Sequence, residues 1–389
     1  MSLTEELSLA KETIGMHARA FGLDFFEVVF ELLDWNEINV VASYGGFPSR
    51  YPHWRFGMEF ERMSKSYRYG LSKIYEMVIN NDPCYAYLLR SNSLIDQKMV
   101  MAHVYGHSDF FKNNQYFAHT NRKMMDEMGN HRAKVQRYVN RFGLNPVESF
   151  IDRSLSLENL IDLHHPGMQP RRPSEHRFLE EDSAKALRNE TAEPARTRLP
   201  ERDILRFLID QAPLEDWERE LLSIIREEQY YFSPQAQTKI LNEGWAAYWH
   251  SRIMTGKVLT DSEVIDYASH HAATVSPQPG KLNPYKIGME LLRDIERRFG
   301  HQKIFQARAL HNDLTFLDEF LTDEFCETQK FFTYGFNQAN GTYEIIDRDF
   351  KKVKEKLLMS LTNLGNPIVQ VQDGNFGGHG ELSLKHVHE

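Results

Sequence analysis

The feature that most constrains this sequence is the segment KMVMAHVYGHSDFFKNN, residues 98–114, with two histidines at its centre. On a helix, His103 and His107 lie four residues apart on one face, with Cβ atoms about 5–6 Å apart. Their imidazoles can therefore bind a single ion. Since the chain has 17 histidines in 389 residues, about one such pair arises by chance, and two buried, hydrogen-bonded histidines remain the alternative.

A second segment, NEGWAAYWH, residues 242–250, supplies a carboxylate that could complete this site. Glu243 stands among aromatic and small residues, where a buried carboxylate is costly unless it is paired or bound to a metal. Together with His103 and His107 it makes a two-histidine, one-glutamate set that leaves a coordination position open for water or substrate. His250 follows two helical turns later, about 10 Å along the axis, so we expect it to line the cleft or orient a substrate.

Charge and cysteine content narrow the classes of function. The chain carries 46 Lys and Arg against 55 Asp and Glu, a formal charge of −9, which argues against nucleic acid as a partner. Its two cysteines, Cys84 and Cys326, exclude a disulfide framework, so we expect reduced, buried thiols. Any metal must then be held by histidines and carboxylates.

Hydropathy predicts a protein without a membrane span, because the apolar runs fall far short of the roughly 20 residues that a bilayer requires. The first residues, MSLTEELSLAKETIG, lack the basic and apolar regions of a signal peptide. We therefore expect a cytoplasmic protein.

The N-terminal part predicts helices that surround a short β-hairpin. Residues 1–35 show helical spacing, including Phe26, Val29 and Leu33, and residues 36–57 are interrupted by Gly and Pro as in a long loop. The runs YEMVINN and CYAYLLRSN predict a hairpin or two adjacent strands. The histidine helix follows, and then a helix from about His119 to Phe142 that Gly143 ends.

The rest of the chain predicts more helices and a small mixed unit. Ser233 and Pro234 are typical of a helix start, and GTYEIID, FKKVKEKLLMSL, PIVQVQDG and ELSLKHVH predict strand, helix, strand, strand. The fold class is therefore predominantly helical α+β. The predicted parts are residues 1–165, half of a core with the histidine helix; 166–200, a charged linker; 201–322, the helical half with Glu243; and 323–389, an α+β unit.

The motif HTNRKMMDEMGNH offers a possible second metal site. On one helix His119 and Asp126 would share a face, and Glu127 and His131 would share another. These side chains could hold a second ion or accept hydrogen bonds from the first pair of imidazoles. A solvated polar helix face is the alternative.

Several motifs together resemble the SpoVR family, the stage V sporulation protein R-like proteins of bacteria. They are YPHWRFGMEFERMSKSYRYG, INNDPCYAYLLRSNSLIDQKMVMAHVYGHSDFFKNN, HTNRKMMDEMGNH, FIDRSLSLENLID and NEGWAAYWHS. The resemblance runs from about residue 10 to the end and implies an association with spore cortex formation. It also implies genetic linkage to a serine protein kinase and a von Willebrand A-like protein. Family members usually continue past the equivalent of Glu389, so we expect the chain to be truncated there.

A more distant resemblance is to gluzincin metallopeptidases, in which an HExxH helix and a later EGWAxY helix supply two histidines and a glutamate. It places His103, His107 and Glu243 on the metal-ligand positions of a gluzincin-like core. Val104 stands where these peptidases carry the catalytic base, and the loss of such a base typically costs 10²–10⁴-fold in rate. Candidates for a substitute are Asp109, Glu127, His131, Tyr248 and His250. In such enzymes a downstream His or Tyr stabilises the oxyanion, which singles out His271 and Tyr285.

The first hypothesis is a metal-dependent hydrolase that cleaves amide bonds of cell-wall material or peptides, with zinc as the first expectation and iron or manganese as alternatives. The second is a non-haem iron enzyme, since two histidines and one carboxylate also describe the facial triad of iron oxygenases. The third is a non-catalytic, metal-binding regulatory protein that works with the kinase system.

Overall fold

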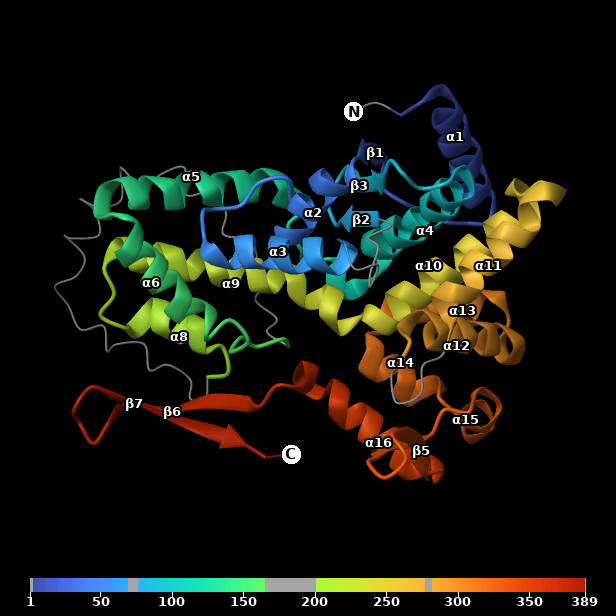
Figure 1. Ribbon diagram of the computed structural model, residues 1–389. Helices are drawn as coiled ribbons and strands as arrows, with labels where there is room; N and C mark the ends of the chain where they lie inside the picture. The colour runs from blue at the N-terminus through green and yellow to red at the C-terminus, as the bar shows by residue number, and fades with distance from the viewer. Residues whose placement is uncertain (1–2, 69–75, 165–200, 277–281, 389) are drawn as a thin grey trace. The chain divides into compact units, whose positions relative to one another are not determined.

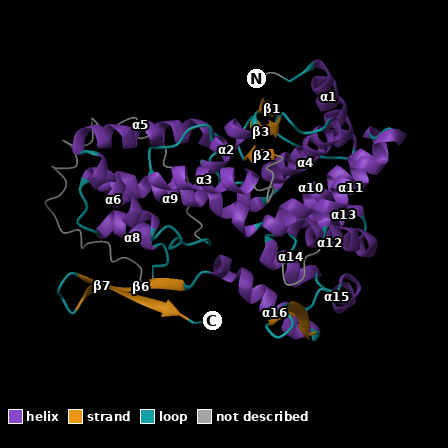
Figure 2. Cartoon of the chain, in the orientation of Figure 1, coloured by secondary structure: helices purple, strands orange, loops and turns teal. Residues whose placement is uncertain are grey.

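The chain folds into a predominantly helical α+β structure with three small sheets, seen in a computed structural model that describes residues 3–68, 76–164, 201–276 and 282–388 (Figures 1 and 2). The predicted fold class is confirmed at this level. Contacts divide the chain into two compact units, residues 1–147 with 232–365, and residues 148–231 with 366–389. The predicted linker, 166–200, lies outside the described residues.

The first unit is built around helix α4 (Leu94–Asn113), which is buried along nearly its whole length. Ser93 and Asp96 close a capping box at its N-terminus, so the backbone N–H groups of these two residues are satisfied. Its predicted helical character is confirmed. Helix α10 (Lys239–Ile253) packs against α4, and helix α12 (Pro284–Phe299) packs against α10.

Two close backbone approaches set the separation of these three helices. A Cβ atom on Gly106 of α4 would lie 2.7 Å from the Cα of Ala246, and one on Gly244 of α10 would lie 2.4 Å from the Cα of Gly288. Real Cβ contacts are longer than this, so only glycine fits at either crossing. The helix carrying Glu243 is thereby held close to the helix carrying the two histidines.

A three-stranded sheet in the order β1-β3-β2 precedes α4. Strands β2 (Glu76–Ile79) and β3 (Cys84–Leu89) pair antiparallel, which confirms the predicted hairpin. Strand β1 (Val28–Leu33) pairs parallel to β3, with Val28 opposite Cys84. The prediction of a helix over Phe26, Val29 and Leu33 is wrong, because alternate residues of VVFELL are buried, as in a strand.

The predicted loop over residues 36–57 is also wrong in large part. Helix α2 (Trp35–Ser43) begins at a capping box made by Asp34 and Glu37, and helix α3 (Trp54–Arg68) follows after a glycine-containing turn. Helix α1 (Glu5–Ala20), by contrast, is confirmed. Helix α5 (Met124–Phe142) ends before Gly143, as predicted, but it begins five residues later than the predicted start at His119.

The remaining elements of the first unit are helices and one hairpin. They are α11 (Val264–Val275), α13 (His301–Leu310), α14 (Asp313–Phe320), α15 (Asp323–Gln329), β4 (Thr333–Asn337), β5 (Thr342–Asp347) and α16 (Phe350–Leu361). Strand β5 and helix α16 were predicted. Strand β4, the antiparallel partner of β5, was not predicted.

The second unit contains most of α6 (Leu144–Leu155), helix α8 (Ile204–Gln211), most of α9 (Asp216–Gln237), and the hairpin of β6 (Ile368–Phe376) and β7 (Glu381–Val387). Ile204, Phe207 and Val371 form its small apolar core. The predicted helix start at Ser233 and Pro234 is wrong, because α9 runs through Pro234 and α10 begins after Thr238.

Among the residues that the structure describes, no helix combines the length and the apolar character that crossing a bilayer requires.

Candidate metal centre

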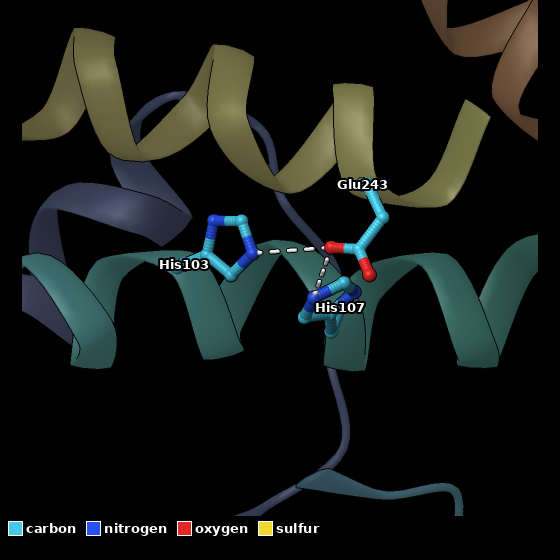
Figure 3. A group of neighbouring side chains, drawn as sticks. All are labelled: His103, His107 and Glu243. Carbon is cyan, nitrogen blue, oxygen red and sulfur yellow. Dashed lines mark ion pairs between the residues drawn. The ribbon is translucent and has the colours of Figure 1, made fainter. Parts of the chain in front are cut away.

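Helices α4 and α10 bring two imidazoles and one carboxylate together (Figure 3). His103 Nε2 lies 3.5 Å and His107 Nε2 lies 3.4 Å from the same oxygen, Glu243 Oε2. Ligand atoms bound at 2.0–2.2 Å to a tetrahedral ion are about 3.3–3.5 Å apart, so both separations suit atoms that share an ion. They are longer than an ordinary N–H···O hydrogen bond of about 2.9–3.0 Å.

The carboxylate of Glu243 is placed where a cation would be stabilising. Its Oε2 is buried and makes no hydrogen bond with any described residue, and a buried polar atom of this kind is costly. Burial raises the pKa of the Glu243 carboxyl, but interactions with His103 and His107 outweigh burial and hold the pKa well below its usual range. Glu243 is therefore ionised, and the chemistry of the three donors fits a divalent metal.

The second ring nitrogen of each imidazole, Nδ1, contacts a side chain of α10. His107 Nδ1 lies 2.9 Å from Asn242 Oδ1, and His103 Nδ1 lies 2.9 Å from His250 Nδ1. An amide oxygen can only accept, so His107 donates from Nδ1, and Nε2 is the nitrogen that faces Glu243 and is left to bind a metal. Hydrogen bonds of this kind orient histidines in metal sites.

The start of α10 is fixed by Asp313, the first residue of α14. The N–H groups of Ile240 and Leu241 donate to its two oxygens at 2.8 and 2.9 Å. Burial raises the pKa of Asp313 from its ordinary 3.8 to about 7, against the lowering effect of these two hydrogen bonds. Asp313 thus anchors the turn that carries Asn242 and Glu243.

Replacing Asp313 with asparagine should change how stability depends on pH. The fold keeps the Asp313 proton up to about pH 7, whereas the unfolded chain releases it near 3.8. The carboxyl therefore favours folding most below pH 4 and loses that contribution as pH rises toward 7. We expect the difference in unfolding free energy between wild type and Asp313→Asn to fall by roughly 2–4 kcal/mol from pH 4 to pH 7. Urea unfolding at four pH values measures it, and a pH-independent difference would contradict the assignment.

Three of the predicted catalytic residues lie beside the centre. His250 contacts His103, and His271 Nδ1 on α11 lies 2.9 Å from His250 Nε2. The ring of Tyr285 on α12 lies 5.9 Å from the ring of His103. The sequence thus placed these residues in the neighbourhood of the ligands, and their catalytic roles stay predictions.

Other predicted residues make contacts elsewhere. Asp109 Oδ1 accepts from the backbone of Asp24 and Oδ2 from Trp245 Nε1, both at 2.8 Å. Tyr248 donates to Glu296 of α12 at 2.7 Å. The structure therefore gives Asp109 and Tyr248 partners that hold helices together.

The residues of the predicted second site lie on and before α5. His119 is exposed and precedes the helix, so the prediction that it shares a helix face with Asp126 is wrong. His131 Nε2 lies 3.5 Å from Glu127 Oε1, and the predicted proximity of this pair is confirmed.

Sequence reasoning missed Asn242, Asp313 and the three crossing glycines. Asn242 precedes Glu243 directly, but its partner His107 is 135 residues away. The glycines carried a weak signal, since a glycine inside a helical pattern costs about 1 kcal/mol and usually has a packing reason.

The fold and this side-chain set define a predominantly helical protein with a candidate mononuclear metal centre of two histidines and a glutamate. Residues 2–366 match the family described as SpoVR like protein, and the chain belongs to this family. It is similar to the uncharacterized protein YcgB of Escherichia coli (strain K12), with 28% identity over 95% of this chain and 83% of that protein. No solved structure matches the chain.

Proposed function

We propose that the chain is a metal-dependent hydrolase of amide bonds, with one divalent ion, zinc as the first choice, held by His103, His107 and Glu243. The observation that carries the proposal is the pair of 3.4 and 3.5 Å separations between imidazole nitrogens and one buried carboxylate oxygen. A three-ligand set leaves a fourth position for water or a substrate carbonyl. A bound zinc ion would lower the pKa of its water toward about 7 and polarise a carbonyl.

The order of the ligands supports a gluzincin-like core. A strand pair precedes the helix with His103 and His107, and Glu243 comes from a later helix packed against it. The membership of the SpoVR-like family leads us to propose cell-wall peptides of the spore cortex as the substrate class. Tyr285, beside His103, is our choice for the donor to the developing oxyanion.

The chain differs from gluzincin peptidases at Val104, which takes the position of their catalytic base and is fully buried in the core. Since no general base occupies that position, we expect a turnover about 10²–10⁴-fold slower than that of an enzyme with glutamate there. This expectation separates the proposal from that of an ordinary metallopeptidase.

The test is hydrolysis of defined amides by zinc-loaded protein. Wild type incubated with a muropeptide digest and with a peptide mixture should release new amino groups, detected by mass spectrometry. Glu243→Gln, which keeps the shape of the ligand but removes its charge, should abolish the release, and the exposed His119→Ala should not alter it. Fully zinc-loaded wild type that cleaves neither mixture would contradict the proposal.

A non-haem iron enzyme is the second candidate, and the absence of a base at Val104 favours it. Two histidines and one carboxylate with open positions suit iron(II) and oxygen chemistry, which does not require that base. Oxygen consumption by the iron-loaded protein but not by Glu243→Gln would support this candidate over hydrolysis.

A further inference from the structure

Three imidazoles form a continuous hydrogen-bonded chain that leads away from the candidate metal position. His103 Nδ1 contacts His250 Nδ1, and His250 Nε2 contacts His271 Nδ1, each at 2.9 Å. His103 and His250 are buried and His271 is half-buried. Each of the two contacts joins a pair of ring nitrogens, so in each pair one nitrogen donates and the other accepts.

A chain of hydrogen-bonded imidazoles that each carry one ring proton can run in two directions. Each ring has one N–H donor and one lone pair, so the proton position on one ring fixes it on the next. If His103 carries its proton on Nε2, facing Glu243, then His250 donates from Nδ1 and His271 donates from its own Nδ1. If His103 carries its proton on Nδ1, His250 accepts at its own Nδ1 and donates from Nε2 to His271 Nδ1. His250 and His271 then both carry their protons on Nε2.

His107 has no such choice, because Asn242 Oδ1 only accepts and keeps its proton on Nδ1. The two candidate ligands therefore differ. His107 is fixed for metal binding in advance, whereas the state of His103 is shared with His250 and His271.

We propose that metal binding at His103 sets the direction of this chain, and that His271 is a positioning residue that stabilises the metal-bound direction from α11. The inference rests on the proposed metal centre. A metal takes the lone pair of His103 Nε2, which selects the direction in which His271 accepts at Nδ1 and carries its proton on Nε2. By linkage, an acceptor at position 271 then strengthens metal binding.

The rearrangement conserves protons along the chain. As the metal enters, the proton on His103 Nε2 leaves, His103 Nδ1 takes the proton of His250 Nδ1, and His250 Nε2 takes that of His271 Nδ1. His271 Nε2 takes one proton from water. One proton leaves at the metal end and one enters at the other end, so the number of protons on the three rings does not change.

Helix α11 is held in place by contacts separate from the chain. His270 Nδ1 lies 2.5 Å from Asp96 Oδ1, and Lys98 Nζ lies 2.7 Å from Glu263 Oε1, just before α11. The ring of Tyr267 stacks on His271 with centroids 5.6 Å apart. The neighbours His270 and His271 thus have different tasks, which allows a matched comparison.

The first test is nuclear magnetic resonance of protein labelled with nitrogen-15 in its histidine rings, with His271 assigned from the signals missing in His271→Asn. We expect the His271 proton on Nδ1 without metal and on Nε2 after one equivalent of zinc, since ring-nitrogen shifts report protonation. The same tautomer in both states would overturn the proposed direction change.

The second test is zinc affinity measured by competition with a chelator in three variants. His271→Leu removes the acceptor and should weaken zinc binding about 10-fold, as loss of such supporting hydrogen bonds does. His271→Asn, although smaller, retains an acceptor in its amide oxygen and should bind like wild type. His270→Leu loses the Asp96 contact but not the chain, and should also bind like wild type.

The outcomes separate this inference from the metal centre itself. Equal losses in His270→Leu and His271→Leu, or no recovery in His271→Asn, would attribute the effect to helix docking and overturn the inference alone. Wild type that binds no zinc would overturn both proposals. Tight zinc binding that His271→Leu leaves unchanged would overturn only the role of His271.

Discussion

Replacement of Gly244 by alanine is expected to destabilise the first unit by about 3 kcal/mol, at the upper end of typical overpacking effects. The added Cβ would lie 2.4 Å from the backbone of Gly288, so α10 and α12 must move apart. Gly288→Ala meets the same crossing from the other side, with its Cβ 2.1 Å from the carbonyl oxygen of Ile240. Because the two changes strain one contact, the double variant should lose less than the sum of the single losses. Denaturant unfolding measures all three.

Gly129→Ala is the matched control for this prediction. Gly129 lies inside α5, and beyond the adjoining backbone of that helix no atom of the described residues lies within 4 Å of an added Cβ. Alanine there should stabilise the helix by roughly 0.5–1 kcal/mol. Unfolding of Gly244→Ala at the same denaturant concentration as wild type would contradict the close backbone contact between α10 and α12.

Replacement of Asp109 by alanine should also cost much stability, about 3–5 kcal/mol. Asp109 is fully buried, Trp245 donates to it, and Arg308 Nε lies 3.5 Å from it. Burial raises the pKa of this carboxyl to about 6, against the lowering effects of Arg308 and of hydrogen bonds. Its removal leaves the buried Arg308 guanidinium without its carboxylate. Thermal and denaturant unfolding report the loss.

The control is Asp24→Ala, a substitution at the residue whose backbone N–H donates to Asp109. The Asp24 side chain is 63% exposed and pairs with Lys112, while its backbone N–H donates to Asp109. An exposed ion pair contributes about 0–1 kcal/mol, so this variant should remain close to wild type. A stable Asp109→Ala protein that loses only hydrolysis would instead support Asp109 as the catalytic base.

The candidate ligands could be assembled from the sequence because their signals are local. Helical spacing places His103 and His107 together, and the surroundings of Glu243 reveal a buried charge. The supporting contacts could not be found in this way. Asn242 gains its role from His107 on another helix, and nothing near Asp313 indicates that it caps α10, 73 residues before it. His250 and His271 were singled out from the sequence, but their contacts with His103 and with each other were not predicted.

The errors in the fold have the same origin. Strand β1 is mostly apolar, and the spacing of its apolar residues also fits a helix. Its pairing with β3, in which each residue lies opposite the residue 56 positions later in the sequence, decides the conformation. Ser233 and Pro234 look like a helix start, yet the preceding turn is already helical and α9 continues through them. In each case structure outside the matching residues outweighs the local pattern: the pairing with β3 for β1, and the helix that already precedes Ser233 for α9.

The most direct test of the metal centre is elemental analysis of protein purified without a metal-chelating tag. Wild type, His103→Ala and Glu243→Gln should be measured beside His119→Ala, with folding of each verified by circular dichroism. The account predicts about one zinc or iron per chain in wild type and in His119→Ala, and none in the two ligand variants. A folded wild type that holds no metal after incubation with zinc and iron, or ligand variants that keep a full equivalent, would contradict it.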